Sequence, residues 1–123
     1  MKDFRDLKVW RKAHELALRA YEVSGTFPAD ERFGLTSQVR RSAGSIGANI
    51  AEGCGRGSDG ELGRFLQIAM GSAAELEYHM LLARDLGFVS DANYDDIQEK
   101  LTEVKRMLAS LIVKLRVDAQ SRS

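Results

Sequence analysis

A chain of 123 residues has the usual length of one domain, and its hydrophobic fraction of 44% and charged fraction of 29% are typical of a globular protein with its own core. Lysine plus arginine and aspartate plus glutamate both number 18, and this zero net charge argues against a protein that coats nucleic acid by bulk charge. The single cysteine, Cys54, excludes an internal disulfide, and neither a signal peptide nor a membrane-spanning apolar run is evident. We therefore expect a cytoplasmic protein without a membrane partner.

Four helices are predicted, at about 6–24, 35–51, 59–86 and 91–117. Residues that end helices lie between them: Pro28 follows the first, Gly53–Gly57 follow the second, and Gly87 suits the left-handed position after the third. Ser58 and Glu61 have the spacing of a capping box, which predicts the start of the third helix. The polar residues after the fourth helix are expected to fray. Short connections between four helices favour an antiparallel up-down-up-down bundle.

The fourth helix has the simplest apolar pattern. Its apolar residues recur at alternating steps of four and three: Ile97, Leu101, Val104, Leu108, Leu111 and Leu115. This spacing is typical of one seam that faces one core. No internal repeat or second domain is evident, so we expect a single all-α domain over residues 1–123.

The first helix has more apolar surface than one core can cover. It has two apolar stripes, one of Val9, Ala13, Leu16, Ala20 and Val23 and one of Leu7, Trp10, Ala17, Leu18 and Tyr21. At ~100° per residue the two stripes span roughly 220°, whereas the surface of a monomer needs a face of about 100°. The third helix is uncharged over 65–74 and is expected to be largely buried. This excess predicts a homo-oligomer, with Trp10, His14 and Tyr21 as candidate interface residues.

The second helix has a polar stripe beside its apolar one. Its members follow at steps of three, four, four and three residues: Gln38, Arg41, Ser45, Asn49 and Glu52. We interpret the stripe as a buried hydrogen-bond network that fixes helix register or a subunit interface. A binding groove is the alternative. If the chain turns back near Arg56, Arg41 is predicted to contact Glu75, and we expect this pair to be buried.

Basic residues suggest two places where nucleic acid binds. Lys8, Arg11, Lys12 and Arg19 share the exposed arc of the first helix, where interspersed glutamates favour an ion-paired, solvated face. In a ring, however, each residue repeats around the axis and forms a basic belt, which is how nucleic acid would bind. Arg56 lies in a glycine-rich segment that resembles a phosphate cradle. The segment follows a helix rather than a strand and lacks the P-loop lysine, so a plain helical hairpin is the main interpretation.

No catalytic or metal-binding motif is present in the sequence. His14 and His79 are isolated, and zinc sites need several Cys, His or carboxylate ligands at set spacings. The Glu-x-x-His motif of di-iron bundles, the Arg-x4-His pattern of a helical ribonuclease and a nucleophile elbow are all missing. We therefore expect neither an enzyme nor a cofactor.

The order and spacing of several short elements resemble the bacterial four-helix bundle proteins of the 23S rRNA intervening-sequence family, and the likeness runs from about Phe4 to Leu115. The elements are Leu7, Trp10, Phe27-Pro28, Glu31, Gly34-Leu35, Gln38, Arg41, Ser45-Ile46, Asn49-Ile50, Glu52-Gly53, Glu75 and Met107-Leu108. Some family members are encoded within large-subunit ribosomal RNA genes, and a related branch comprises the accessory proteins of diversity-generating retroelements. The resemblance implies a left-handed up-down-up-down bundle and a ring-shaped homo-oligomer, commonly a pentamer.

The resemblance also bears on function. It implies no established enzymatic reaction, and the accessory branch binds nucleic acid and a reverse transcriptase through a basic surface. We therefore expect a non-enzymatic oligomeric scaffold or adaptor that engages RNA, DNA or a nucleic-acid enzyme through repeated basic surfaces. The alternative is a purely protein-binding assembly without nucleic-acid contact, which the zero net charge favours.

Overall fold

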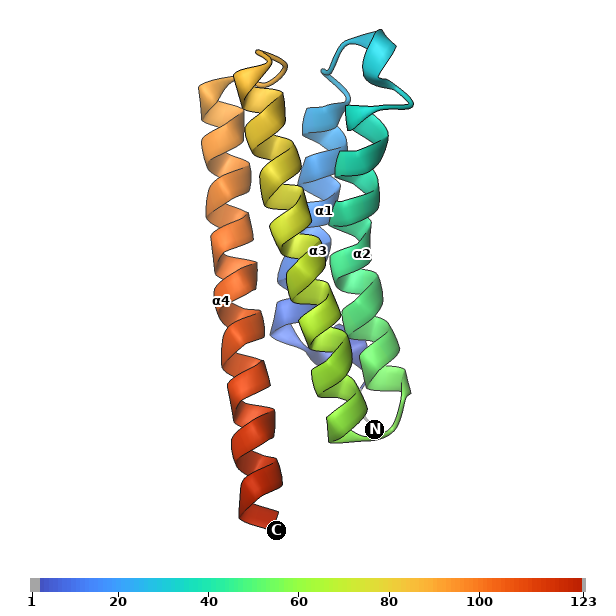
Figure 1. Ribbon diagram of the computed structural model, residues 1–123, viewed down its shortest axis with the longest axis vertical. Coiled ribbons are helices and arrows are strands. Elements are labelled where there is room, and N and C mark those ends of the chain that lie inside the picture. The colour runs from blue at the N-terminus through green and yellow to red at the C-terminus, as the bar shows by residue number, and fades with distance from the viewer. Residues whose placement is uncertain (1–2, 123) are drawn as a thin grey trace.

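The computed structural model describes residues 3–122, and within this range the protein consists of helices without strands. The helices are a short 3-10 turn η1 (Phe4–Asp6), α1 (Lys8–Ser24), a second 3-10 turn η2 (Ala29–Glu31), α2 (Leu35–Gly55), α3 (Asp59–Asp85) and α4 (Asp91–Arg122). The four α-helices pack side by side along most of their length (Figure 1).

All four helices contribute to one apolar core. The largest fully buried side chains include Leu16 from α1, Ile46 and Ile50 from α2, Leu76 from α3 and Leu101 from α4. On α1 the stripe from Val9 to Val23 is the buried one, because its members are at most 4% exposed. The second stripe of α1 stays partly exposed, so the prediction that one core does not cover all the apolar surface of this helix is confirmed.

The predicted capping residues lie at the helix boundaries, as expected. Ser58 precedes α3, and its hydroxyl accepts a hydrogen bond from the backbone N–H of Glu61 at 3.2 Å. Gly57 and Gly87 have φ values of 86° and 78°, a region that glycine enters without steric strain. These two glycines therefore set the turns that follow α2 and α3.

Three helix ends differ from the sequence-based expectation. Leu7 is extended and separates η1 from α1, so the first α-helix begins at Lys8 rather than near residue 6. The second helix continues past residue 51 to Gly55, and the reversal waits for the left-handed Gly57. The fourth helix continues past residue 117 to Arg122, because neither proline nor glycine follows to stop it.

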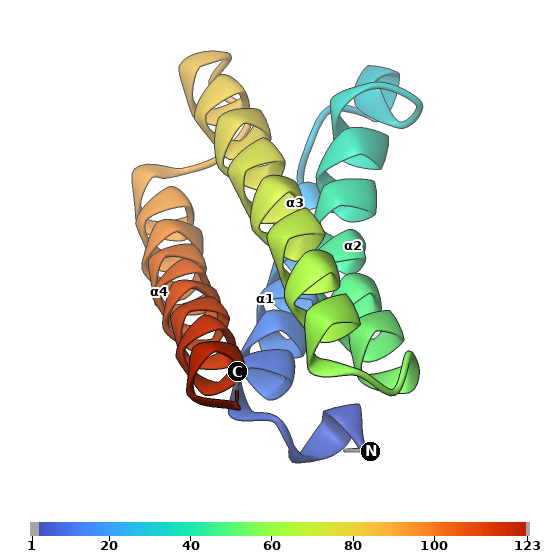
Figure 2. The same ribbon diagram turned by 60° about the horizontal axis from the view of Figure 1, so that its bottom comes forward.

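The two ends of the bundle differ. At the upper end, the rings of Phe27 and Phe88 pack together with centroids 6.0 Å apart. At the lower end, η1 turns away from α4 and packs toward α2 (Figure 2). Leu111 and Leu115 of α4 therefore stay partly exposed, although the seam pattern predicted a position in the core, and Ile112 is buried instead.

The third helix is less buried than predicted. Its core side is covered, as for Leu66 and Leu76, but its outer side exposes Ile68, Tyr78 and Leu81 by 42%, 59% and 36%. The bundle itself covers only one side of each helix, so the uncharged outer surface of α3 has no partner within the described chain.

Candidate functional site

An apolar groove runs between α1 and α2 on the outside of the bundle. It has a volume of about 440 Å³ and is lined by Phe4, Trp10, Ala13, His14, Ala17, Leu18, Tyr21, Gly44, Gly47, Ala48 and Ala51. All three candidate interface residues, Trp10, His14 and Tyr21, therefore line one groove. Leu18 and Tyr21 are 60% and 50% exposed, so large apolar side chains stand open to solvent along it.

Aromatic stacking organises the lower part of the groove. The Trp10 indole stacks on the His14 imidazole with ring centroids 5.0 Å apart, and Phe4 meets Trp10 edge to face at 4.8 Å. A Cβ added to Gly47 would lie 3.4 Å from the indole nitrogen of Trp10. The absence of a side chain at Gly47 therefore lets the Trp10 indole lie close to α2.

The outer surface of α3 is a second apolar surface. We call it the α3 face; it consists of Ile68, Gly71, Ala74, Tyr78 and Leu81, all exposed. Its residues recur at steps of three and four, which places them along one side of the helix. The groove lies between α1 and α2, whereas the α3 face lies on a single helix, so the two apolar surfaces differ.

The predicted polar stripe on α2 divides into three separate groups: Gln38 with Arg41, Ser45 with Asn49, and Glu52 with Arg56. Ser45 Oγ lies 2.9 Å from Ser72 Oγ of α3, and the Asn49 amide donates to the backbone oxygen of Ser45 at 2.8 Å. Glu52 accepts a hydrogen bond from Arg56 at 2.6 Å and does not join the serine group. Only the serine–asparagine group is partly buried between the helices.

The predicted contact between Arg41 and Glu75 is confirmed, but the expectation that the pair is buried is wrong. Arg41 donates to the carboxylate of Glu75 and, at 2.8 Å, to the side chain of Gln38. The side chains of Arg41 and Glu75 are 53% and 40% exposed. The pair lies on the outer rim of the α2–α3 contact, where water screens it, so its contribution is that of a surface ion pair.

His79 lies beside this ion pair and is half-buried. Its Nδ1 is a buried atom with no hydrogen-bond partner among the described residues. Burial lowers the pKa of His79, the nearby Glu75 carboxylate opposes this shift, and Arg41 adds to it. The folded chain therefore favours the neutral imidazole.

Ion pairs join α4 to the two helices beside it. Arg19 of α1 donates to Asp96 at 2.7 Å, which lowers the pKa of Asp96, and Lys100 adds to the effect. Glu77 of α3 accepts from Lys105 at 2.8 Å and from Gln98 at 2.9 Å. These two hydrogen bonds lower the pKa of Glu77.

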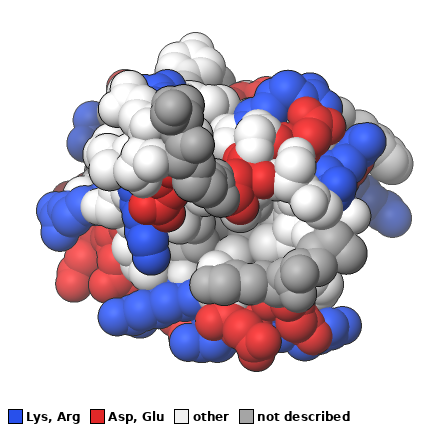
Figure 3. Space-filling model, turned by 90° about the horizontal axis from the view of Figure 1, so that it is seen from below, with Lys and Arg blue, Asp and Glu red and all other residues white. Residues whose placement is uncertain are grey.

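Most of the basic residues predicted to meet nucleic acid are occupied by partners. Lys12 lies 3.4 Å from Glu103, Arg19 is paired with Asp96 and Glu22, and Arg56 is paired with Glu52. Arg11 donates to the backbone oxygen of Arg5 at 3.0 Å, and Lys8 is exposed in a shallow groove beside α4. Seen from below, basic and acidic side chains alternate around the molecule (Figure 3). The belt hypothesis stays a prediction.

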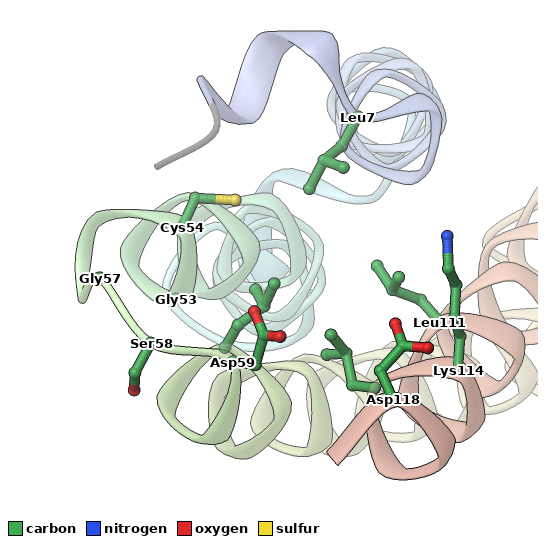
Figure 4. Close-up of a pocket in the computed structure, with 11 residues that line it drawn as sticks. Leu7, Gly53, Cys54, Gly57, Ser58, Asp59, Leu111, Lys114 and Asp118 are labelled. Carbon is green, nitrogen blue, oxygen red and sulfur yellow. The ribbon is translucent and has the colours of Figure 1, made fainter. Parts of the chain in front are cut away.

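A cavity of about 330 Å³ opens at the lower end of the bundle, lined by Leu7 just before α1 begins but by no residue of α1 itself. Figure 4 shows Leu7, Cys54 and Leu111 pointing toward this opening from η1–α1, α2 and α4. Lys114, Asp59 and Asp118 also line it. Across the part of the chain that the structure describes, no group of three or more His, Cys, Asp or Glu side chains is placed to hold a metal ion. None of the described helices is long and apolar enough to cross a membrane.

One cluster of arginine and aromatic side chains at the upper end was not predicted from the sequence. Arg32, Phe33 and Arg40 gather around the start of α2 together with Tyr21. The only signal in the sequence was an arginine next to a phenylalanine in the turn between the first two helices. Phe33 is a single apolar residue in a turn and belongs to no periodic pattern, so its spacing does not predict a role.

Four helices around one apolar core define a small helical-bundle protein with exposed apolar grooves. The chain belongs to the family described as 23S rRNA-intervening sequence protein, whose model matches residues 5–110. No match was found among curated proteins.

The fold is similar to a solved structure of the same kind. This is the crystal structure of a protein with unknown function from the S23 ribosomal protein family of Bacteroides thetaiotaomicron VPI-5482. The two chains are 30% identical, the match covers 85% of this chain and 94% of the other, and the TM-score is 0.78. This likeness in fold agrees with the family to which the chain belongs.

Proposed function

We propose that this protein is a non-enzymatic scaffold whose copies assemble head to tail into a closed ring. The observation that carries the proposal is the presence of two unlike apolar surfaces, the α1–α2 groove and the α3 face. A two-fold dimer uses the same surface on both partners, whereas two different surfaces that fit each other join copies in one direction. The rotation between copies then closes a ring, and the family resemblance favours five subunits.

The proposed subunit is an antiparallel up-down-up-down bundle. Contacts between neighbouring helices support this direction, because residue numbers fall along one helix as they rise along the next. Arg19 pairs with Asp96 and Lys12 with Glu103 between α1 and α4. Arg41 pairs with Glu75 and Ser45 with Ser72 between α2 and α3.

The proposed role of the ring is to hold RNA or DNA, or an enzyme that acts on nucleic acid, in the cytoplasm. A ring multiplies each basic side chain around one axis, so a chain with zero net charge still presents a repeated cationic surface. A purely protein-binding ring is the alternative, and the ion-paired state of Lys12, Arg19 and Arg56 favours it.

Glycine substitutions test the ring with little risk to the fold. Gly44 lies in the groove and Gly71 on the α3 face, and an added Cβ at either would meet no other atom within 4 Å. Gly44→Gln and Gly71→Gln therefore fit the single chain but block a neighbouring copy. Thr102→Gln on the exposed side of α4 is the matched control.

Light scattering after size exclusion gives the readout. The unmodified chain and Thr102→Gln should elute as the same oligomer, and each glycine variant should elute as a monomer with unchanged helical circular dichroism. Because each variant keeps one intact surface, an equimolar mixture of the two should form a dimer and no ring. A monomeric unmodified chain would overturn the proposal, and so would a mixture that stays monomeric.

The nucleic-acid part of the proposal has its own test. Labelled structured RNA and duplex DNA are titrated with the protein across a salt series. Binding that weakens steeply with salt supports a phosphate-binding surface. The absence of binding even at low salt would contradict this part and leave the protein-binding ring.

A further inference from the structure

Phe33 is an unusual surface residue at the upper end of the bundle. Its side chain is 89% exposed, more than that of any other large apolar residue that the structure describes. It lies in the turn between η2 and α2, where it makes no contribution to the core. The guanidinium of Arg32 stands over its ring, 5.3 Å from the centroid. An aromatic ring held in water beside a cation suggests a surface that another flat ring contacts.

A second cation, Arg40, lines the same pocket as Phe33. Arg40 donates to Ser24 Oγ at 2.9 Å and to the backbone oxygen of Tyr21 at 3.1 Å, and its guanidinium lies 4.9 Å from the centre of the Tyr21 ring. These partners are neutral and use only two of its five N–H donors. Among the described residues, no carboxylate forms an ion pair with Arg32 or Arg40, so both charges stay available.

The two cations and the aromatic rings surround one pocket of about 430 Å³. Its lining consists of Tyr21, Arg32, Phe33, Thr36, Ser37, Arg40 and Arg41, without a carboxylate. The hydroxyls of Thr36 and Ser37 add neutral hydrogen-bonding groups. Glu31, in the turn before α2, accepts the backbone N–H of Leu35 at 3.0 Å, and Glu75 accepts from Arg41. The pocket thus combines cations, hydroxyls and an exposed ring.

We propose that this pocket binds one nucleotide unit of a single-stranded nucleic acid, with a base stacked on Phe33 and its phosphate held by Arg32 and Arg40. Aromatic platforms beside cationic grooves bind single strands in this way. A duplex hides the faces of its bases, so the exposed ring favours an unpaired strand. The inference deepens the proposed function: it rests on its nucleic-acid part, while the ring can hold or fail independently.

The experiment measures fluorescence anisotropy of a labelled oligouridylate and of a duplex of equal length, across a salt series. Phe33→Leu removes the ring and keeps an apolar side chain, whereas Phe33→Trp keeps a ring. Arg32→Gln and Arg40→Gln remove the two charges. Arg84→Gln is the matched control, because Arg84 is a surface arginine at the same end of the bundle that is paired with Asp85 and lies over an aromatic ring, that of Tyr94.

We expect the single strand to bind more tightly than the duplex. Phe33→Leu should weaken single-strand binding by about tenfold, and Phe33→Trp should keep it. Each of Arg32→Gln and Arg40→Gln should lower the salt dependence of single-strand binding by about 0.7 in slope, with Arg84→Gln unchanged.

The possible failures are distinguishable. If the unmodified protein binds RNA or DNA but Phe33→Leu and the two arginine variants bind equally well, the proposed pocket is wrong and the scaffold function stands. If it binds no nucleic acid, both the pocket and the nucleic-acid part fail. If Phe33→Leu disrupts the oligomer without changing binding, Phe33 belongs to a subunit contact and the inference is overturned.

Discussion

Gly53 of α2 and Phe65 of α3 lie so close together that a Cβ added to the glycine would stand 2.9 Å from the Cβ of Phe65. Real side-chain carbons do not approach so closely. The Cβ of Phe65 cannot move aside, because this residue is buried and closely packed. The glycine therefore serves the contact between two helices. This explains why α2 continues through a position that its sequence marks as a helix end.

The substitution Gly53→Ala should lower the free energy of unfolding by about 1–3 kcal/mol, since the extra methyl group overpacks the α2–α3 contact. Gly55→Ala is the control, because a Cβ there meets no atom within 4 Å. Urea denaturation followed by circular dichroism measures both. Equal stability of the two variants would show that α2 and α3 separate at no cost.

The Arg41–Glu75 ion pair should contribute little to stability. Both side chains are about half exposed, and pairs of this kind typically contribute about 0.2–1 kcal/mol. A double-mutant cycle with Arg41→Met and Glu75→Gln isolates the interaction from the effect of each substitution. A coupling energy of several kcal/mol would mean that a neighbouring copy buries the pair.

The lowered pKa of His79 makes stability depend on pH. In the unfolded chain this histidine takes up a proton near its ordinary pKa of 6.5, whereas the folded chain resists protonation. The unfolded state therefore binds more protons as the pH falls below about 6.5, and the free energy of unfolding decreases there. His79→Gln should flatten this part of the stability curve, measured by urea denaturation at a series of pH values. A slope identical to that of the unmodified chain would contradict the role of His79.

Glu77 should govern a separate, more acidic range. Its pKa is lowered in the folded chain by Lys105 and Gln98, so the stabilisation is present above its ordinary value of 4.5 and is lost as the pH falls through the lower folded pKa. Glu77→Gln should be less stable at neutral pH and lose less stability on acidification. The partner variant Lys105→Met should remove the larger part of the same acid dependence, because Gln98 still donates to Glu77. An unaltered acid profile in both variants would contradict the role of the Glu77–Lys105 pair.

Much of the fold follows from local patterns in the sequence. The Ser58–Glu61 capping pair and the left-handed Gly87 set helix ends in the expected places. The buried stripe of α1 and most of the α4 seam also follow from spacing, since period alone decides which side of a helix is apolar.

The differences come from relations between helices, which local patterns do not contain. Leu111 and Leu115 continue the seam of α4, but their burial depends on where α1 begins on the opposite side of the bundle. The exposure of Arg41 likewise depends on how far it stands from the core axis. Phe33 and Arg40 come together only because the turn between α1 and α2 folds back over the start of α2.

The open lower end and the closed upper end make each subunit polar along its length. In a ring whose axis runs along the bundles, every copy points the same way, so one annular surface would carry only upper ends and the other only lower ends. Phe33 and its arginines would then form a circle on one side, while the cavities bounded by Leu7 and Leu111 would form a circle on the other. Such a disc has a front and a back, and a single strand bound at the circle of Phe33 residues would run along one side of the disc alone.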